Sequence, residues 1–108
     1  MKKFKIVTYV PLSSFNKVRI AMGDAGAGKL GKYSHASFSS RGTGRFIAGE
    51  GAHPAIGEIG KLQEVEEEKI EVICEKGKVK GVIEAIKRIH PYEEIPIEIF
   101  PMLSEEDF

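Results

Sequence analysis

The sequence predicts an α+β domain in which one antiparallel sheet carries two helices on a single face. Its length of 108 residues suits one compact domain. Segments with alternating apolar residues, typical of strands, are interleaved with two segments whose apolar residues recur every three or four positions, typical of helices. Their order is strand–helix–strand twice, with a long loop between, which is the order of a ferredoxin-like βαβ-βαβ sandwich.

The first strand and the first helix are predicted within residues 3–25. Apolar side chains alternate along residues 4–10, and Pro11 ends the strand. Ser13 or Ser14 can cap the helix that follows. The helical stripe is formed by four apolar residues: Phe15, Val18, Met22 and Ala25.

A glycine-rich stretch, GDAGAGKLGKY at residues 23–33, contains two patterns found in nucleotide-binding loops. Such loops hold phosphate when a helix follows the glycines, because the helix N-terminus supplies free N–H groups and a positive dipole end. Here the helix comes first, and Leu30 stands where a Ser or Thr should bind magnesium. We therefore interpret the stretch as a helix end with Gly26 as a left-handed cap.

Two strands and a loop are predicted in the middle of the chain. Residues 33–39 form a strand that places His35 and Ser37 on one face, and a turn at two glycines leads to a short returning strand over residues 45–48. Residues 49–61, rich in glycine, form a long loop of a kind that is often functional.

The second half of the chain supplies a strand, a helix and a last strand. Residues 64–76 are ambiguous, because their glutamate-rich front suits a helix, and we predict a strand from about Glu67. Residues 79–89 have helical spacing and are closed by His90 and Pro91.

The last strand contains Ile95, Ile97 and Ile99, and Pro96 within it predicts an edge position or a strand start. The domain is predicted to span residues 1–103, followed by a frayed acidic tail at 104–108.

Composition excludes several functions. Sixteen basic residues balance sixteen acidic residues, so neither nucleic acid nor a membrane surface is an expected partner. The apolar runs are shorter than the ~20 residues that a membrane span needs. The single cysteine, Cys74, allows no internal disulfide and is expected to be buried, which fits a cytoplasmic protein.

The order and spacing of several motifs carry a resemblance to a known family. Together they resemble the small domain inserted in YqfO-type proteins, also called the NGG-one-interacting-factor-three-like family, and HPYE resembles the C-terminal part of CutA. The motifs are YVP at 9–11, GAGKLGKY at 26–33, SF at 37–38, GTGRF at 42–46, HPAIG at 53–57, EEKIE at 67–71 and HPYEE at 90–94.

The resemblance implies a CutA/PII-like fold and a homotrimer. It also implies that the di-metal site of the full-length relatives lies on other domains, so no catalytic residue is transferred and the chain is expected not to be an enzyme. This chain departs from the pattern at Ala36, where many relatives have Cys, and at Lys69, where Arg is common. HPYEEIP also has one residue more than the corresponding CutA segment.

Three histidines, His35, His53 and His90, are the candidate metal ligands, with Glu50 or Glu93 completing a site for a divalent ion such as copper or zinc. The alternative gives each histidine a separate structural role. For a small ligand the candidate residues are Arg45, Glu50, His53 and Glu93, because an arginine fork can hold an anion and the long loop is a natural binding element.

Two functions from different classes follow. The first is a trimeric small-molecule or metal-ion binding module with a regulatory role, which uses clefts between subunits. The alternative is a metal-dependent hydrolase, or an accessory that covers or partners a YqfO-type protein. The sheet face opposite the helices is expected to carry Val7, Tyr9, Ile73 and Phe100 and to be covered by other subunits.

Overall fold

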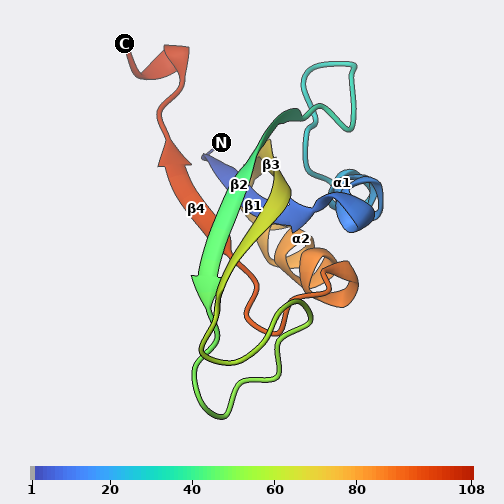
Figure 1. Cartoon of the computed structure of the whole chain (residues 1–108). Coiled ribbons are helices and arrows are strands. Elements are labelled where there is room, and N and C mark those ends of the chain that lie inside the picture. Colours follow the sequence, from blue (N-terminus) through green and yellow to red (C-terminus); the bar gives the residue numbers. More distant parts are fainter. Residues whose placement is uncertain (1) are drawn as a thin grey trace.

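The computed structural model describes residues 2–108 and shows one four-stranded antiparallel sheet with both helices packed on the same face (Figure 1). The predicted fold class is therefore confirmed. The sheet has the order β2-β3-β1-β4, and residue 1 of the predicted domain lies outside the described residues. The elements are β1 (Lys3–Pro11), α1 (Phe15–Asp24), β2 (Phe38–Ile47), β3 (Leu62–Glu75), α2 (Lys76–Ile89) and β4 (Ile97–Met102).

The core lies between the two central strands and the two helices. Alternate residues of β1 and β3 point toward the helices, and Ile6 and Ile70 are fully buried there. Burying an aliphatic side chain of this size contributes roughly 1.5–3 kcal/mol. The remaining buried members of the cluster are Val10, Val18, Met22, Ala27, Val72, Cys74, Val82 and Ile86.

The C-terminus of α1 confirms the interpretation of the glycine-rich stretch. Gly26 has a φ of 111°, its N–H donates to the Gly23 carbonyl at 3.0 Å, and the Ala27 N–H donates to the Met22 carbonyl at 3.1 Å. These two bonds form a Schellman motif, which satisfies the last carbonyls of the helix. At the other end Ser14 occupies the N-cap position, but its side chain makes no capping bond, so that detail of the prediction is wrong.

The predicted pair of short strands in the middle of the chain is wrong. A single strand, β2, runs through Gly42 and Gly44 and pairs with β3 along its whole length. Residues 33–37 precede it, and His35 has a φ of 60°, which no strand residue adopts. The glycines do not form a turn because β3 begins at Leu62, five residues before the predicted start, and provides the partner backbone.

The glutamate-rich front of β3 is stabilised as a strand by two arginines of β2, which pair with two of its helix-side carboxylates. Arg41 Nε lies 3.2 Å from Glu68 Oε1, and Arg45 Nε lies 2.9 Å from Glu64 Oε2. Opposite charges on neighbouring strands contribute a few tenths of a kcal/mol, roughly 0.2–1 per pair. The helical alternative for residues 64–66 is thereby excluded.

The last strand lies at the edge of the sheet, as Pro96 predicted. Pro96 immediately precedes β4, and its carbonyl accepts a hydrogen bond of 2.9 Å from the Thr8 hydroxyl. The segment predicted to fray, residues 104–108, contains a 3-10 turn over Glu105–Asp107, in which Asp107 accepts from the Ser104 N–H at 2.7 Å. None of the helices in residues 2–108 has the length and apolarity to span a membrane.

Candidate functional site

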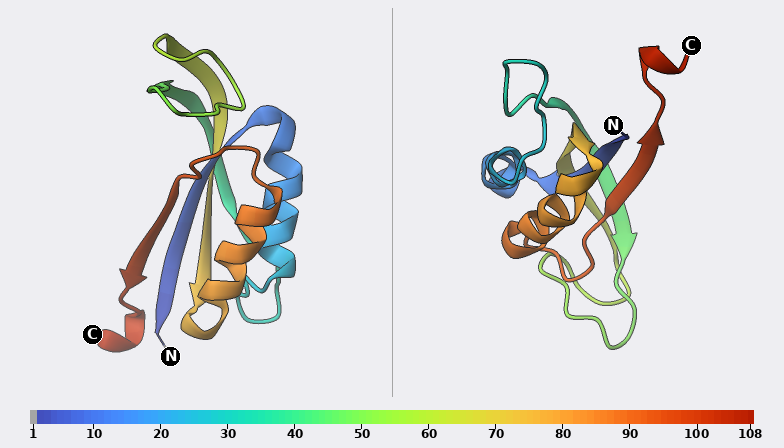
Figure 2. Two further views of the ribbon diagram at one scale, coloured as in Figure 1. Left: turned by 90° about the horizontal axis from the view of Figure 1, so that it is seen from below. Right: turned by 180° about the vertical axis from the view of Figure 1, so that it is seen from behind.

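The two ends of the elongated molecule differ in what they contain (Figure 2). One end, which we call the loop end, carries residues 48–61 and the connection 90–96 between α2 and β4. The opposite end, the terminal end, carries the connection 25–37 between α1 and β2 together with both chain termini. Each end has a cavity lined by segments that are distant in the sequence.

The loop-end cavity has a volume of about 510 Å³ and lies between the end of β2, the long loop and the segment after α2. Three aromatic rings and several aliphatic side chains line it, together with a few charged groups. This combination of apolar walls and a small number of polar groups is typical of sites for small molecules. The lining side chains include Tyr9, Arg45, Phe46, Ile47, Ala52, Pro54, Ile56, Glu67, Tyr92, Glu93, Glu94 and Pro96.

Tyr92 and Glu67 form the fixed polar centre of this cavity. The Tyr92 hydroxyl donates to Glu67 Oε2 at 2.6 Å, a short charge-assisted hydrogen bond. Burial raises the pKa of the Tyr92 hydroxyl above its ordinary value, and the bond to Glu67 raises it further. A side chain at Gly44 would collide with Glu67 Oε1, so the glycine keeps room for this carboxylate.

His90 lies behind the cavity wall and contacts the backbone of Tyr9 and Tyr92. It is 6% exposed, its Nε2 donates to the Tyr9 carbonyl at 2.7 Å, and its Nδ1 accepts from the Tyr92 N–H at 3.2 Å. A carbonyl can only accept and an amide can only donate, so the imidazole is neutral with its proton on Nε2. Burial lowers the pKa of His90, although the bond to Tyr9 and the charge of Glu67 oppose this. The two ring nitrogens are thus used to hold the aromatic wall in place.

The residues predicted to bind a small ligand are only partly brought together. Arg45 and Glu93 both line the loop-end cavity. Glu93 Oε1 accepts from the His53 N–H at 2.9 Å, so His53 is joined to the site through its backbone. Glu50 is exposed and does not line the cavity.

The three histidines predicted as metal ligands lie in separate places. His35 is at the terminal end, where Nε2 donates to Asp24 Oδ1 at 3.0 Å and the Ser34 hydroxyl lies 2.9 Å from Nδ1. His53 is in the long loop, and His90 is buried below Tyr92. Within residues 2–108, His, Cys, Asp and Glu side chains form no group of three or more that could hold a metal ion.

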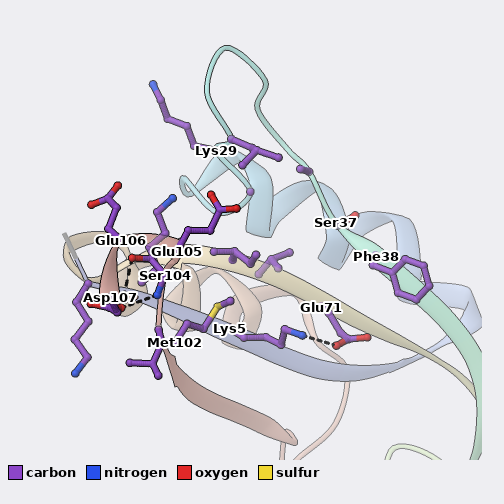
Figure 3. A pocket seen from close by; sticks show the side chains of 18 residues that line it. Lys5, Lys29, Ser37, Phe38, Glu71, Met102, Ser104, Glu105, Glu106 and Asp107 are labelled. Carbon is purple, nitrogen blue, oxygen red and sulfur yellow. Dashed lines mark hydrogen bonds and ion pairs between the residues drawn. The ribbon is translucent and has the colours of Figure 1, made fainter.

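The terminal cavity is larger, about 940 Å³, and its lining is of another kind (Figure 3). Lys5 and Glu71, on the neighbouring strands β1 and β3, point toward each other with Nζ and Oε1 3.3 Å apart, and the turn from Ser104 to Asp107 closes one side of the cavity. Its lining includes four lysines and four acidic residues, so its charges balance: Lys2, Lys3, Lys5 and Lys29 against Glu71, Glu105, Glu106 and Asp107.

Sequence reasoning did not identify Tyr92, Glu67 or Phe46 as site residues. Tyr92 and Phe46 belong to the HPYEE and GTGRF motifs, so membership of these motifs was a usable signal. Glu67 begins the EEKIE motif, but it stands in a run of glutamates, and only the folded structure brings it to Tyr92. The hydrogen bonds that join Asp24, His35 and Ser34 could not be predicted from the sequence either, because they depend on the left-handed backbone of His35.

Comparison with known proteins shows similarity along almost the whole chain. No family model matches it. It is 46% identical over 98 residues, 91% of this chain, to a protein of Bacillus subtilis named GTP cyclohydrolase 1 type 2 homolog. It is 42% identical to a Bacillus cereus protein described as related to NIF3, whose structure covers 95% of this chain with a TM-score of 0.84. In both comparisons the chain spans 26% of the relative's length.

More distant structures share the fold. CutA of Archaeoglobus fulgidus superposes on 99% of this chain with a TM-score of 0.66 and 17% identity. The match includes 91% of the CutA chain. GlnK, in the GlnK–ATP complex of B. subtilis, superposes on 94% of this chain with a TM-score of 0.64 and 18% identity. The match includes 82% of the GlnK chain. The chain therefore has a CutA/PII-like fold and is similar to one domain of the YqfO-type, NIF3-like family, corresponding to about a quarter of the length of these relatives.

Proposed function

We propose that this chain is a small-molecule binding module with a regulatory role, that its ligand occupies the loop-end cavity, and that it works as a homotrimer in the cytoplasm. The observation that carries the proposal is the construction of that cavity. Its aromatic walls come from β1, β2 and the segment after α2, and a buried histidine and a short Tyr92–Glu67 bond hold them in position. A prearranged site of this kind loses little conformational freedom when a ligand binds.

Thermal-shift screening against a library of small aromatic amines, alcohols and acids tests this role. We expect some compounds to raise the melting temperature, because a ligand that binds only the folded state stabilises it. Ala52→Trp is the variant that fills the cavity, since residue 52 is half-buried and lines it. Compounds that stabilise both proteins equally bind elsewhere and would contradict the proposal.

The trimer is supported by the sheet face opposite the helices. Phe100 and Ile73 flank Lys5 on this face, and they are 48% and 39% exposed. Phe38 of the edge strand is 67% exposed beside Glu71 on the same face. Large apolar groups in this position are typical of an interface.

Light scattering measures the association directly. We expect a mass three times that of the 11.9 kDa chain. Phe100→Asp should abolish the trimer, because the new carboxylate would be buried without a partner in the sheet-to-sheet contact. The matched variant Ile20→Asp changes an exposed apolar residue of α1, on the far side of the sheet, and should leave the mass unchanged. A mass of one chain for the unsubstituted protein would contradict the trimer.

The alternative, a metal-dependent hydrolase or its accessory, is favoured by the name of the relatives, which refers to GTP. This chain corresponds to about a quarter of those proteins, so any such activity belongs first to the whole protein. GTP hydrolysis by this chain with added zinc or manganese, abolished by chelation, would favour the alternative over the binding module.

A further inference from the structure

The loop-end cavity presents a net negative charge to whatever enters it. Among residues 2–108, Arg45 is the one basic residue that lines it, against three glutamates. Arg45 is already engaged, because its Nε donates to Glu64, which does not line the cavity. The terminal cavity differs, since its basic and acidic residues are equal in number.

The three carboxylates retain oxygens that can accept from a ligand. Glu67 uses Oε2 for the Tyr92 hydroxyl, and Glu93 uses Oε1 for the His53 N–H. Glu94 makes no side-chain hydrogen bond or ion pair within residues 2–108. An ionised carboxylate accepts about four hydrogen bonds, so each of these groups has capacity left for a donor.

The walls of the cavity suit the same kind of ligand. Three aromatic residues line it, and aromatic ring faces attract cations electrostatically. The aliphatic part of the lining offers a surface for an apolar body. The wall residues are Tyr9, Phe46, Tyr92, Ile47, Pro54, Ile56 and Pro96.

We infer that the cavity selects an organic cation, an amine or quaternary ammonium group on an apolar body, and disfavours phosphate-bearing molecules. The inference rests on the proposed binding role and specifies its ligand class. A nucleoside triphosphate would bring several negative charges against Glu67, Glu93 and Glu94, and like charges in a partly enclosed cavity repel strongly. The GTP in the name of the relatives is therefore not the ligand of this cavity.

Calorimetric titration with three probes of similar shape but different charge tests the selection. The probes are benzyltrimethylammonium, benzyl alcohol and phenylacetate, with GTP as a fourth titrant. We expect the cation to bind about tenfold more tightly than benzyl alcohol, and phenylacetate and GTP to bind more weakly than both. Phenylacetate or GTP binding as tightly as the cation would overturn the inference.

A pair of glutamine variants shows whether the selection comes from this cavity. Glu94→Gln removes one exposed carboxylate and should weaken binding of the cation about twofold to fivefold, while benzyl alcohol binds as before. Glu84→Gln, on the exposed side of α2 and away from the cavity, should change neither. An equal loss in both variants would overturn the assignment to the loop end.

The outcomes also separate this inference from the proposed function. If benzyl alcohol and the cation bind equally tightly and Ala52→Trp abolishes both, the charge selection is wrong while the cavity remains a binding site. If none of the probes binds, the selection of organic cations is wrong, and the library screen then decides the binding role on its own.

Discussion

The loop end and the terminal end of this molecule both carry a cavity, and the larger of the two is the weaker candidate for a binding site. The terminal cavity is about 940 Å³, but much of its lining consists of lysines and the acidic turn near the chain terminus. The loop-end cavity is about 510 Å³ and is built around a buried histidine and a short Tyr92–Glu67 bond. The comparison shows that fixed side-chain geometry, rather than volume, distinguishes a candidate site.

The two ends also differ in how they use histidine, and this gives the largest expected effect. His90 and His35 each have partners for both ring nitrogens, but His90 is buried and His35 is exposed. His90→Ala should lower the free energy of unfolding by about 3 kcal/mol, because it leaves a cavity and an unpaired Tyr9 carbonyl.

His35→Asn is the matched variant at the terminal end, since asparagine tolerates the left-handed backbone of residue 35. It should lower the free energy of unfolding by less than about 1 kcal/mol, because exposed hydrogen bonds and ion pairs usually contribute no more than this. Urea denaturation measures both values. A larger loss for His35→Asn than for His90→Ala would reverse the comparison between the two ends.

Two glycines of β2 isolate the contribution of the Glu67 carboxylate. Gly44→Ala should cost about 2 kcal/mol, because the new methyl group collides with Glu67 Oε1 and displaces it from Tyr92. Gly42→Ala lies in the same strand with nothing within 4 Å of its new methyl group, and should be neutral or slightly stabilising. Equal losses in the two variants would mean that the effect arises from the strand and not from the site.

Tyr92→Phe removes the bond to Glu67 and should cost about 1 kcal/mol near neutral pH. The pKa of Tyr92 is raised in the folded state. Its contribution to the free energy of unfolding is therefore complete below the ordinary tyrosine pKa of about 10 and is lost as the pH rises above that value. The stability of the unsubstituted protein should therefore fall more steeply above pH 10, by up to about 1.4 kcal/mol per pH unit, than that of the variant.

Tyr9 has a raised pKa as well, but it is present in both proteins and does not affect their difference. Unfolding curves between pH 7 and 11.5 give the comparison. Parallel curves for the two proteins would show that Tyr92 is not held as a neutral donor to Glu67.

The smallest expected effect is at the terminal end. Lys29→Ala should leave the affinity for ATP and GTP unchanged, because Lys29 follows the C-terminus of α1, where carbonyls and not N–H groups face the loop. Calorimetric titration of both proteins checks this. Micromolar nucleotide binding that the substitution abolishes would restore the phosphate-loop interpretation of residues 23–33.

Much of the fold could be predicted from the sequence because the periodic segments are strongly patterned. The alternation in β1, the stripe of α2 and the glycine cap of α1 each depend on neighbours along the chain. The long β2–β3 hairpin could not be predicted, because its glycines and glutamates are poor strand formers that pair only in the context of the sheet. The same context brings Glu67 to Tyr92, so the centre of the candidate site was hidden although Arg45 and Glu93 were identified.

The predicted metal site involves the two ends as well, since its candidate ligands were His35, His53 and His90. Their separation within one chain explains why residue type alone could not decide between a ligand set and three structural roles. Copper or zinc binding remains a prediction, which titration of the triple alanine variant tests.

The most direct test of the account is an amide-shift titration of ¹⁵N-labelled protein with benzyltrimethylammonium, since a single spectrum reports both ends of the molecule. We predict saturable shifts at the amides of residues 44–49, 52, 55, 56 and 92–94, which line the loop-end cavity, and unchanged signals at residues 2, 3, 5, 28–30 and 102–107, which line the terminal cavity. Shifts confined to the terminal group, or spread equally over both groups, would contradict the assignment of ligand binding to the loop end.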